Sequence, residues 1–426
     1  MMVNIGIVLI LVFLVLTLLG FRVYVALGLP ATIYFILQGD LFLAAARMSR
    51  TIDAYSLVAV PLFIFVGSLI NHGGIADKLF KFASNIIGPT KGGVAYVNIF
   101  ASLIFSGMSG SALADIGGIG KVLMSEMEND GYSNSYSAAL TSSAATIGPL
   151  FPPSIPLIIF GVLAGVSVLQ LLLAGLVPAL ILFVGLLGVT MILSHKRDFP
   201  EPDERMELRK TVRSLIKSSP ALGAPVVLVG GMVTGIFGVT EVAAATVFYI
   251  LFINVVFYQV FEVGYIWKSA KEAVETTAVI LVLLATAGIF AQVITRERTH
   301  ILLADALFTI STDPIVLLIM VNLLLILLGL FMEPLSAMLI TIPVVVPTLT
   351  QVGVDPIHVG VIMVFNLMIG LITPPLGLSL FLASDIAGAE YEDTMRDLSP
   401  YYIVLLLTLA VVTFVPAISL WVPSLL

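Results

Sequence analysis

A proline-rich segment that occurs twice, 222 positions apart, constrains the fold of this chain more than any other feature. Residues 145–157 read ATIGPLFPPSIPL, and residues 367–379 read LMIGLITPPLGLS. The offset aligns Gly148 with Gly370, and two consecutive prolines follow in each copy. Proline removes a backbone donor and clashes with the preceding turn, so neither copy can continue as a regular α-helix. The predicted helix breaks are Pro149, Pro152, Pro153, Pro374 and Pro375.

The surroundings of both copies are hydrophobic enough to place the breaks inside a membrane. Hydrophobic residues make up 59% of the sequence, charged residues make up 11%, and the mean hydropathy is +1.14. A soluble domain carries roughly 25% charged residues, so we predict a polytopic membrane protein. Broken backbone is tolerated in lipid only where it faces protein or a wet cavity. The pair of breaks therefore indicates the binding site of a transporter.

Two further features of the composition narrow the function. The sequence contains no cysteine, which excludes disulfides, thiol catalysis and thiolate metal sites. The four histidines form no metal-binding spacing, so we predict no transition-metal site. The first 20 residues have neither a basic start nor a small-residue cleavage site, and we expect a retained first span rather than a signal peptide.

Hydrophobic runs near 20 residues predict ten membrane spans, and two further runs are too long for a single span. We expect these two, residues 93–127 and 314–350, to be re-entrant helical hairpins, because polar, Gly or Pro residues interrupt each near its centre. Residues 38–55 and 259–272 have mixed polarity and are expected to lie at the membrane interface. The ten spans are residues 5–20, 23–37, 56–70, 136–165 (broken), 168–193, 220–235, 239–258, 273–294, 358–386 (broken) and 401–422.

A hydrophilic segment with seven basic residues, 194–219, divides the chain near its midpoint. We predict that it is a cytoplasmic linker between two repeats, residues 1–193 and 220–426. Counting spans from this linker places all basic residues except four on the cytoplasmic side of the membrane. The same count places both termini in the periplasm. The first hairpin then opens to the cytoplasm and the second to the outside, so the predicted fold is all-α, polytopic, with two inverted-topology repeats. The four exceptions are Arg47, Arg50, Arg296 and Arg298.

The hairpin tips align by the same offset, because Gly107 falls on Gly329. Gly and Ser residues let the chain break there and supply oxygen atoms that suit a hard cation such as Na⁺. The returning arms begin near Ser111 and Leu335, where free amides favour a carboxylate. We therefore predict an ion pocket in each half, with an anionic solute between them. The predicted sodium-binding residues are Ser106, Gly107, Ser109, Asp115, Gly148, Phe151, Gly329, Met332, Gly370 and Thr373. The predicted substrate-binding residues are Ser109, Ser111, Ser154, Glu333, Ser336 and Ser379.

Several of these residues also have a purely structural interpretation. Asp115 either coordinates an ion or is a charge near a helix N-terminus that local amides satisfy. Glu333 either binds polar groups of the substrate or caps the helix that starts at Pro334. Hydroxyl groups in membrane helices often bond only to the preceding turn. Glu241 is expected to close a helix start, and Asn366 is expected to pack against a neighbouring helix more than to face the cavity.

The hairpin tips, the two breaks and the segment GAPVVLVGGMVTGIFGVTEVAAATVFYILF at residues 223–252 resemble the large membrane subunit of tripartite ATP-independent periplasmic (TRAP) transporters. The resemblance covers essentially the whole chain. The family pattern of a glycine followed by FTPTEAA appears here as GIFGVTEVA from Gly235. Gly238 and Val239 replace the usual Thr-Pro, a departure that affects a helix start more than the proposed site.

The resemblance implies a Na⁺-driven, elevator-type symporter that spans the bacterial inner membrane many times. It also implies two partners: a small four-span membrane subunit, here a separate chain, and a periplasmic substrate-binding protein. The implied substrate is a small organic anion, with sialic acid ahead of C4-dicarboxylates. Apart from Na⁺ as the coupling ion, no cofactor is expected, and no nucleic acid partner is expected either.

Two other classes of function remain as alternatives. An intramembrane enzyme would pair Asp115 and Glu333 as acid and base, but the sequence has no His-Glu-x-x-His motif and no nucleotide loop. An ion channel would need a continuous polar stripe through several helices. Polar residues instead gather at the two tips and the two breaks, so we predict a transporter and not an enzyme.

Overall fold

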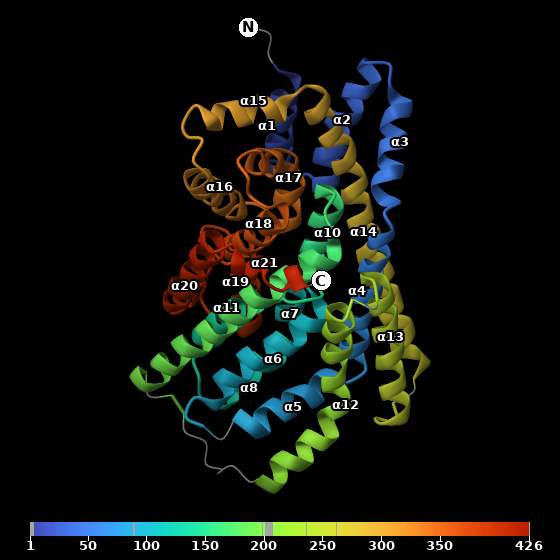
Figure 1. The fold of residues 1–426 in the computed structure, drawn as a ribbon. Helices are drawn as coiled ribbons and strands as arrows, with labels where there is room; N and C mark the ends of the chain where they lie inside the picture. Colours follow the sequence, from blue (N-terminus) through green and yellow to red (C-terminus); the bar gives the residue numbers. More distant parts are fainter. Residues whose placement is uncertain are drawn as a thin grey trace.

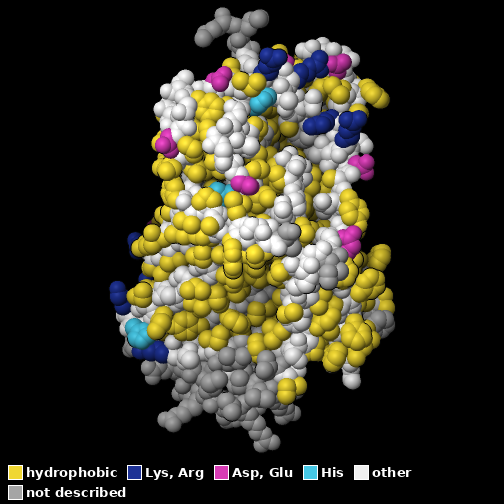
Figure 2. Space-filling view, in the orientation of Figure 1, with side chains coloured by type: hydrophobic (Ala, Val, Ile, Leu, Met, Phe, Trp, Pro, Cys, Tyr) yellow, Lys and Arg dark blue, Asp and Glu magenta, His cyan; other side chains and the backbone are white. Residues whose placement is uncertain are grey.

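The computed structural model describes residues 4–87, 90–197, 199–200, 208–235, 237–260 and 262–425. Within its helices, the side chains of residues 76, 77, 86, 106–109, 208–215 and 217 lie outside this description. The described residues form helices and turns without a β-strand, and six of the helices are long and apolar enough to cross a membrane. The predicted all-α membrane fold is therefore confirmed. Figure 2 shows hydrophobic side chains across the middle of the molecule, with Lys and Arg gathered at its upper end and lower-left edge.

The first half of the chain contains the helices from α1 to α11. They are α1 (Ile5–Leu18), α2 (Val23–Leu37), α3 (Leu41–Ile52), the short 3₁₀ helix η1 (Tyr55–Val58), α4 (Ala59–His72), α5 (Ile75–Ile87), α6 (Gly93–Ser109), α7 (Ala112–Asp115), the π-helical turn η2 (Ile116–Gly120), α8 (Lys121–Asn129), α9 (Asn134–Ala145), α10 (Ile155–Ala164) and α11 (Val168–Lys196). The second half contains α12 (Leu208–Val233), α13 (Val239–Val256), α14 (Val263–Arg296), α15 (Thr299–Phe308), α16 (Pro314–Gly329), α17 (Pro334–Gln351), α18 (Pro356–Leu371), α19 (Leu378–Ala387), α20 (Tyr391–Phe414), α21 (Ala417–Leu420) and η3 (Pro423–Leu425).

The two halves pack in corresponding ways. Helix α2 of the first half lies against α14 of the second, and α13 of the second half lies against α4 of the first. The hairpin helix α6 packs on α9, as α16 packs on α18. Between these pairs, α4 and α14 run alongside each other through the molecule (Figure 1). Such exchange of equivalent contacts is what an internal repeat with inverted topology requires.

Both predicted re-entrant hairpins are present. The arms of the first are α6 and the run from α7 to α8, and they meet at Gly110 and Ser111. The arms of the second are α16 and α17, joined by residues 330–333. In Figure 1 the first hairpin lies in the lower half of the molecule and the second in the upper half. The two hairpins therefore approach the middle of the molecule from opposite ends.

Both predicted broken spans are also present. Residues 146–154 separate α9 from α10, and residues 372–377 separate α18 from α19. All five prolines predicted to break the helices lie within these two segments. Gly148 lies inside the first break, whereas Gly370 is still helical and precedes the last residue of α18. The second break thus begins slightly later than its glycine suggests.

The predicted boundary between residues 272 and 273 is wrong, and so is the end of the predicted span 401–422, because α20 ends at Phe414. Residues 259–272 were expected to form a separate interface helix, but α14 continues without interruption through 34 residues from Val263 to Arg296. Its polar first part contains no proline, and Lys271 pairs with Glu275 one turn later, at 3.7 Å. Nothing in this stretch ends a helix, so polar and apolar parts form one element. In the region of residues 38–55, α3 is a helix of its own that lies along α14.

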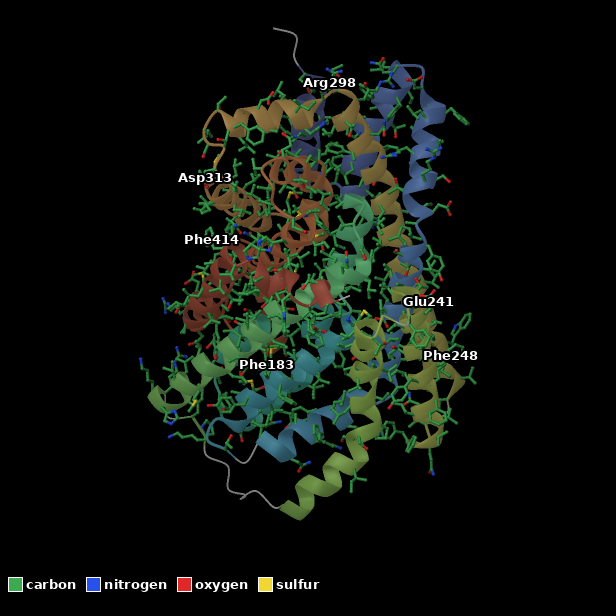
Figure 3. All side chains as sticks on the ribbon, viewed as in Figure 1. Phe183, Glu241, Phe248, Arg298, Asp313 and Phe414 are labelled. Atoms are coloured by element: carbon green, nitrogen blue, oxygen red, sulfur yellow. The ribbon has the colours of Figure 1, made fainter. Side chains whose placement is uncertain are left out.

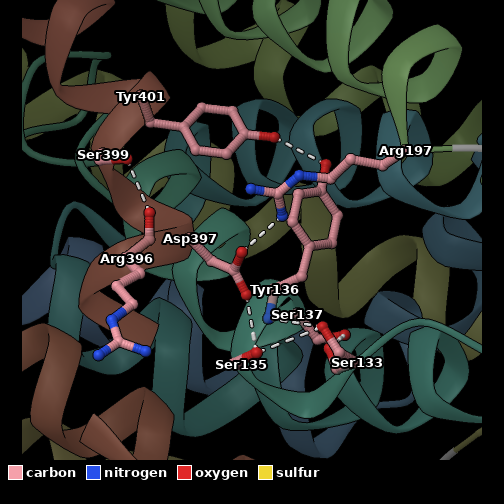
Figure 4. Close-up of polar contacts among 9 residues, drawn as sticks. All are labelled: Ser133, Ser135, Tyr136, Ser137, Arg197, Arg396, Asp397, Ser399 and Tyr401. Atoms are coloured by element: carbon pink, nitrogen blue, oxygen red, sulfur yellow. Dashed lines mark hydrogen bonds and ion pairs between the residues drawn. The ribbon is translucent and has the colours of Figure 1, made fainter. Parts of the chain in front are cut away.

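Helices reach into the predicted linker from both ends. At its start α11 extends to Lys196, and at its end α12 begins at Leu208. Residues 198 and 201–207 lie outside the described part of the chain, so the division into two repeats at residues 194–219 stays a prediction. Beside it, a polar network joins three helices (Figure 4). The Tyr136 and Tyr401 hydroxyls lie 2.7 Å apart, and Arg197 pairs with Asp397.

Acidic side chains at helix starts have local structural roles. Asp313, at the start of α16, accepts a hydrogen bond from the Ile315 amide at 2.7 Å (Figure 3). Glu241, in the first turn of α13, accepts one from the Tyr55 hydroxyl at 2.9 Å. This contact links α13 to the segment that leads into α4, and the expectation that Glu241 closes the start of α13 stays a prediction.

Candidate functional site

A cavity of about 480 Å³ lies where the two hairpin tips, the two broken spans and the pair α4 and α14 converge. We call it the central cavity. Gly110 and Ser111 line it from the first tip, and Glu333 and Pro334 line it from the second. Pro149 contributes from the first break. Equivalent residues of the two halves, such as Ser111 and Glu333, are 222 positions apart in the sequence and line the same cavity, as the inverted arrangement predicts.

The first tip packs directly on the first break. Gly110 has a left-handed φ of +64°, a conformation that glycine adopts without strain. A Cβ atom added to Gly110 would overlap the carbonyl group of Pro153 and lie 3.2 Å from the amide nitrogen of Ile155. Glycine is therefore required here both for its conformation and for the close approach of the two backbones.

The second tip packs on the second broken span through another pair of glycines. A Cβ atom added to Gly370 would lie 2.6 Å from the Cα of Gly329, and one added to Gly329 would lie 2.9 Å from the Cα of Gly370. Both distances are far below van der Waals contact, so α16 and α18 cross at this point with backbone against backbone. The sequence offset pairs Gly329 with Gly107, which lies outside the described side chains.

The first break is buried and is closed by one of its own residues. Ser154 is fully buried, and its hydroxyl donates to the carbonyl of Pro149. The same oxygen accepts a hydrogen bond from the Leu157 amide at 3.2 Å and so caps α10. Ser154 therefore satisfies a freed carbonyl and a free amide at once, and it does not line the central cavity.

The second break is supported from outside. The Tyr402 hydroxyl, on α20, donates to the carbonyl of Ile372 at 2.6 Å, and the Tyr391 hydroxyl donates to the carbonyl of Leu376 at 3.3 Å. The Thr373 hydroxyl donates to the carbonyl of Ile369, one turn earlier, at 2.5 Å. This is the structural interpretation considered above for hydroxyl groups in membrane helices. Pro375 and Leu376 are exposed.

Glu333 acts as the cap of α17 and also lines the central cavity. Its carboxylate accepts from the amide of Ser336 at 3.2 Å and from its hydroxyl at 3.3 Å. The two alternatives considered for Glu333 are thus compatible in the structure. Because this carboxylate already occupies the N-terminus of α17, the free amides expected near Leu335 are not available to a second anion. Ser336 is engaged in the cap and does not line the cavity.

The other predicted site residues lie around the cavity in several environments. Ser111 lines it and caps α7, accepting from the Ala114 amide at 3.4 Å. Asp115, in α7, and Ser379, in α19, are buried, and neither lines the cavity. Met332 is buried, and Phe151 is half-buried. The side chains of Ser106 and Ser109 lie outside the described ones, so their predicted roles stay predictions.

Sequence reasoning missed one wall of the cavity. Ser68 and Asn71 from α4, together with Glu272 and Thr276 from α14, line it opposite the hairpin tips. Glu272 was placed in an interface segment, although an acid beside a membrane span is itself a signal of function. Asn366, by contrast, lies in the interior, where its side-chain amide donates to the Asn322 side chain at 2.7 Å, as expected for helix packing.

Comparison with known proteins agrees with this architecture. The family model described as "Tripartite ATP-independent periplasmic transporter, DctM component" matches residues 10–418. The crystal structure of the YdaH transporter of Alcanivorax borkumensis is similar with a TM-score of 0.61, at 15% identity over 90% of this chain and 89% of that one. This likeness supports the fold alone.

Two relatives are similar in sequence over most of their length. The sialic acid TRAP transporter large permease SiaM of Vibrio cholerae is 38% identical over 382 residues, which cover 90% of this chain and 89% of SiaM. The C4-dicarboxylate TRAP transporter large permease DctM of Pseudomonas aeruginosa is 34% identical over 380 residues, which cover 89% of each chain. Both are permeases and not enzymes. The chain therefore belongs to the DctM family of large permease subunits of tripartite ATP-independent periplasmic transporters.

Proposed function

We propose that this chain is the large permease of a symporter that imports a small organic acid across the bacterial inner membrane, driven by Na⁺. The observation that carries this proposal is the central cavity, which both inverted halves build from a hairpin tip and a broken span. A solute bound there can be reached from one side or the other, depending on how the surrounding elements are placed.

Sialic acid is the favoured substrate, and a C4-dicarboxylate is second. The order follows from similarity, because the sialic acid permease SiaM is 38% identical and the C4-dicarboxylate permease DctM is 34% identical. A volume of about 480 Å³ falls within the range of small-molecule sites. It leaves room for either acid.

Coupling to Na⁺ is supported by the kind of atoms that the breaks supply. Each break interrupts a helix and frees backbone carbonyl groups, and a hairpin packs directly against each broken span. Gly370 faces Gly329 in the second half, and the first break faces Gly110 in the first. Oxygen ligands of this kind suit hard cations. We propose one Na⁺ site at each contact of tip and break.

An elevator movement is supported by the division of the cavity wall. One side consists of the hairpins and broken spans, and the other consists of α4 and α14. We propose that the first group moves as a unit against a scaffold formed by the remaining long helices. A separate small membrane subunit would stabilise this scaffold, and a periplasmic binding protein would deliver the acid. We place both termini in the periplasm.

Uptake into liposomes tests this function. The permease is co-reconstituted with its small subunit, and the binding protein is added outside with labelled sialic acid or labelled succinate. We expect saturable uptake of one acid that requires inward-directed Na⁺ and rises with a Hill coefficient above one. Full uptake in Na⁺-free buffer under a proton gradient would refute Na⁺ coupling. Non-saturable conductance would indicate a channel, and no uptake of any organic acid would refute the proposed class of substrate.

A further inference from the structure

The wall of the central cavity that sequence reasoning missed contains a carboxylate held in place by a buried serine. Ser68, which is only 5% exposed, donates from its hydroxyl to Glu272 Oε2 at 2.5 Å. His72 Nδ1 lies 3.8 Å from the same oxygen and 3.2 Å from the Ser68 hydroxyl. Since Ser68 and His72 are on α4 and Glu272 is on α14, these contacts link two neighbouring helices and give the carboxylate a defined position.

Glu272 stands between two cavities. Besides the central cavity, a second cavity of about 460 Å³ opens beside it, and we call this the side cavity. Asn71, Ala114 and Glu272 line both. Gly117 and Gly118 of the first hairpin also line the side cavity, and they carry no side chain that could block it. A solute that moves from one cavity to the other therefore passes Glu272.

The Asp, Glu, Lys and Arg side chains that line the central cavity in the described part of the chain all have the same sign. Among the described residues that line the central cavity, Glu272 and Glu333 are the charged ones, and neither Lys nor Arg is among them. Glu333 is already hydrogen-bonded as a helix cap, whereas the Glu272 side chain is 54% exposed. An acid with two carboxylates would bring its second negative charge toward Glu272 without a compensating cation from these side chains. An acid with one carboxylate could turn that group away and donate hydroxyl or amide hydrogens to Glu272.

We propose that Glu272 is a specificity-determining residue, which disfavours dianions and favours acids that carry one carboxylate together with hydroxyl or amide donors. This inference rests on the proposed function, because it assumes that an organic acid occupies the central cavity. It assigns a role in selection to the scaffold. The position of Glu272 between the cavities makes it act on both binding and passage.

The test compares ligands that differ in a single charge. One pair is succinate and succinamate, in which an amide replaces one carboxylate. The other pair is N-acetylneuraminate and its analogue with the terminal hydroxymethyl group oxidised to a carboxylate. Binding of each to the purified permease with its small subunit is measured in lipid nanodiscs with Na⁺. The binding protein is omitted, so that its own selectivity does not enter.

The variants are Glu272→Gln, which keeps the acceptor for Ser68 but removes the charge, and Glu272→Asp, which keeps the charge. Glu275→Gln is the matched control, because Glu275 is an exposed acid one turn away on the same helix and lines neither cavity. We expect Glu272→Gln to improve the affinity of the dianion relative to its monoanion about tenfold. Glu272→Asp and Glu275→Gln should keep the ratio of the unmodified protein.

Each outcome bears on a different claim. An unchanged ratio in Glu272→Gln, with ligand binding intact, would overturn the role of Glu272 and leave the proposed function standing. An equal change in Glu275→Gln would also overturn it, because the effect would then be one of net charge and not of position. If none of the four acids binds to the unmodified protein, the proposed substrate class fails instead. If Glu272→Gln is misfolded, it binds neither member of a pair. Glu272→Asp then provides the test, which is whether it still binds the monoanion more tightly than the dianion.

Discussion

The two breaks in the membrane helices share a sequence pattern but are stabilised in different ways. The first break, residues 146–154, is almost entirely buried, and Ser154 within it bonds to a freed carbonyl and to a free amide. The second break, residues 372–377, has exposed residues, and tyrosines at positions 391 and 402 of α20 bond to its carbonyls. The first is therefore self-contained, and the second depends on a neighbouring helix.

This difference indicates that duplicated halves need not behave alike. A self-contained buried segment keeps its shape as long as the core around it is packed. A segment supported by a separate helix keeps its shape only while that helix stays in place. We infer that the second break is the more adaptable of the two, and that α20 controls its geometry.

The largest effect is expected where the second hairpin crosses the second broken span, at Gly329 and Gly370. Replacing Gly370 by Val places a branched side chain against the backbone of Gly329, where even a Cβ atom would lie 2.6 Å from a Cα. We expect insertion into the membrane to persist and uptake to fall below detection. Gly188→Val is the matched control, because Gly188 lies in α11 with no neighbouring atom within 4 Å of an added Cβ. Normal uptake by Gly370→Val would show that α16 and α18 do not need this close packing. Gly148→Val is expected to abolish uptake as well.

A smaller but clear effect is expected at the first break. Ser154→Ala leaves the buried carbonyl of Pro149 without its donor and α10 without its cap, which together cost about 2–3 kcal/mol. Thermal unfolding of the purified protein measures the loss. Ser167→Ala is the control, since Ser167 caps α11 at an exposed position and should cost only about 1 kcal/mol. Equal losses in the two variants would contradict the claim that burial of the first break matters.

The smallest effect on stability is expected at the second break. Tyr402→Phe removes the hydrogen bond to the Ile372 carbonyl and should cost about 1 kcal/mol. Tyr391→Phe removes a longer bond, at 3.3 Å, and should cost less. If the second break is the adaptable one, both changes alter the Na⁺ dependence of uptake more than Ser154→Ala does at matched stability. The reverse order would assign adaptability to the first break.

Much of the fold followed from a few residue types in the sequence. Paired prolines have one physical consequence in a membrane helix, so the positions of both breaks could be predicted. Gly and Ser in the middle of long hydrophobic runs likewise indicated the two hairpins. The role of Glu333 could be narrowed to two alternatives, because an acid before a proline is a common start of a helix.

Other features could not be predicted because they depend on contacts between distant segments. The phenol groups of Tyr391 and Tyr402 belong to the second break only because α20 folds back on it. Ser68 and Glu272 are 204 positions apart and meet only when α4 packs on α14. The pattern of hydrophobicity around Glu272 resembles that of an interface segment, and local pattern alone gives no reason to join it to the span that follows.

The continuity of α14 limits where the scaffold can bend. With 34 residues, the helix is about 50 Å long, and it carries Glu272 near one end and Arg296 at the other. Arg296 pairs with Asp40, which precedes α3, so this end is tied to the turn between α2 and α3. An unbroken rod anchored in this way leaves no joint between the selective carboxylate and its anchor. Any tilt of one end is transmitted to the other, and flexible hinges must be sought in the short connections that lead into the hairpins.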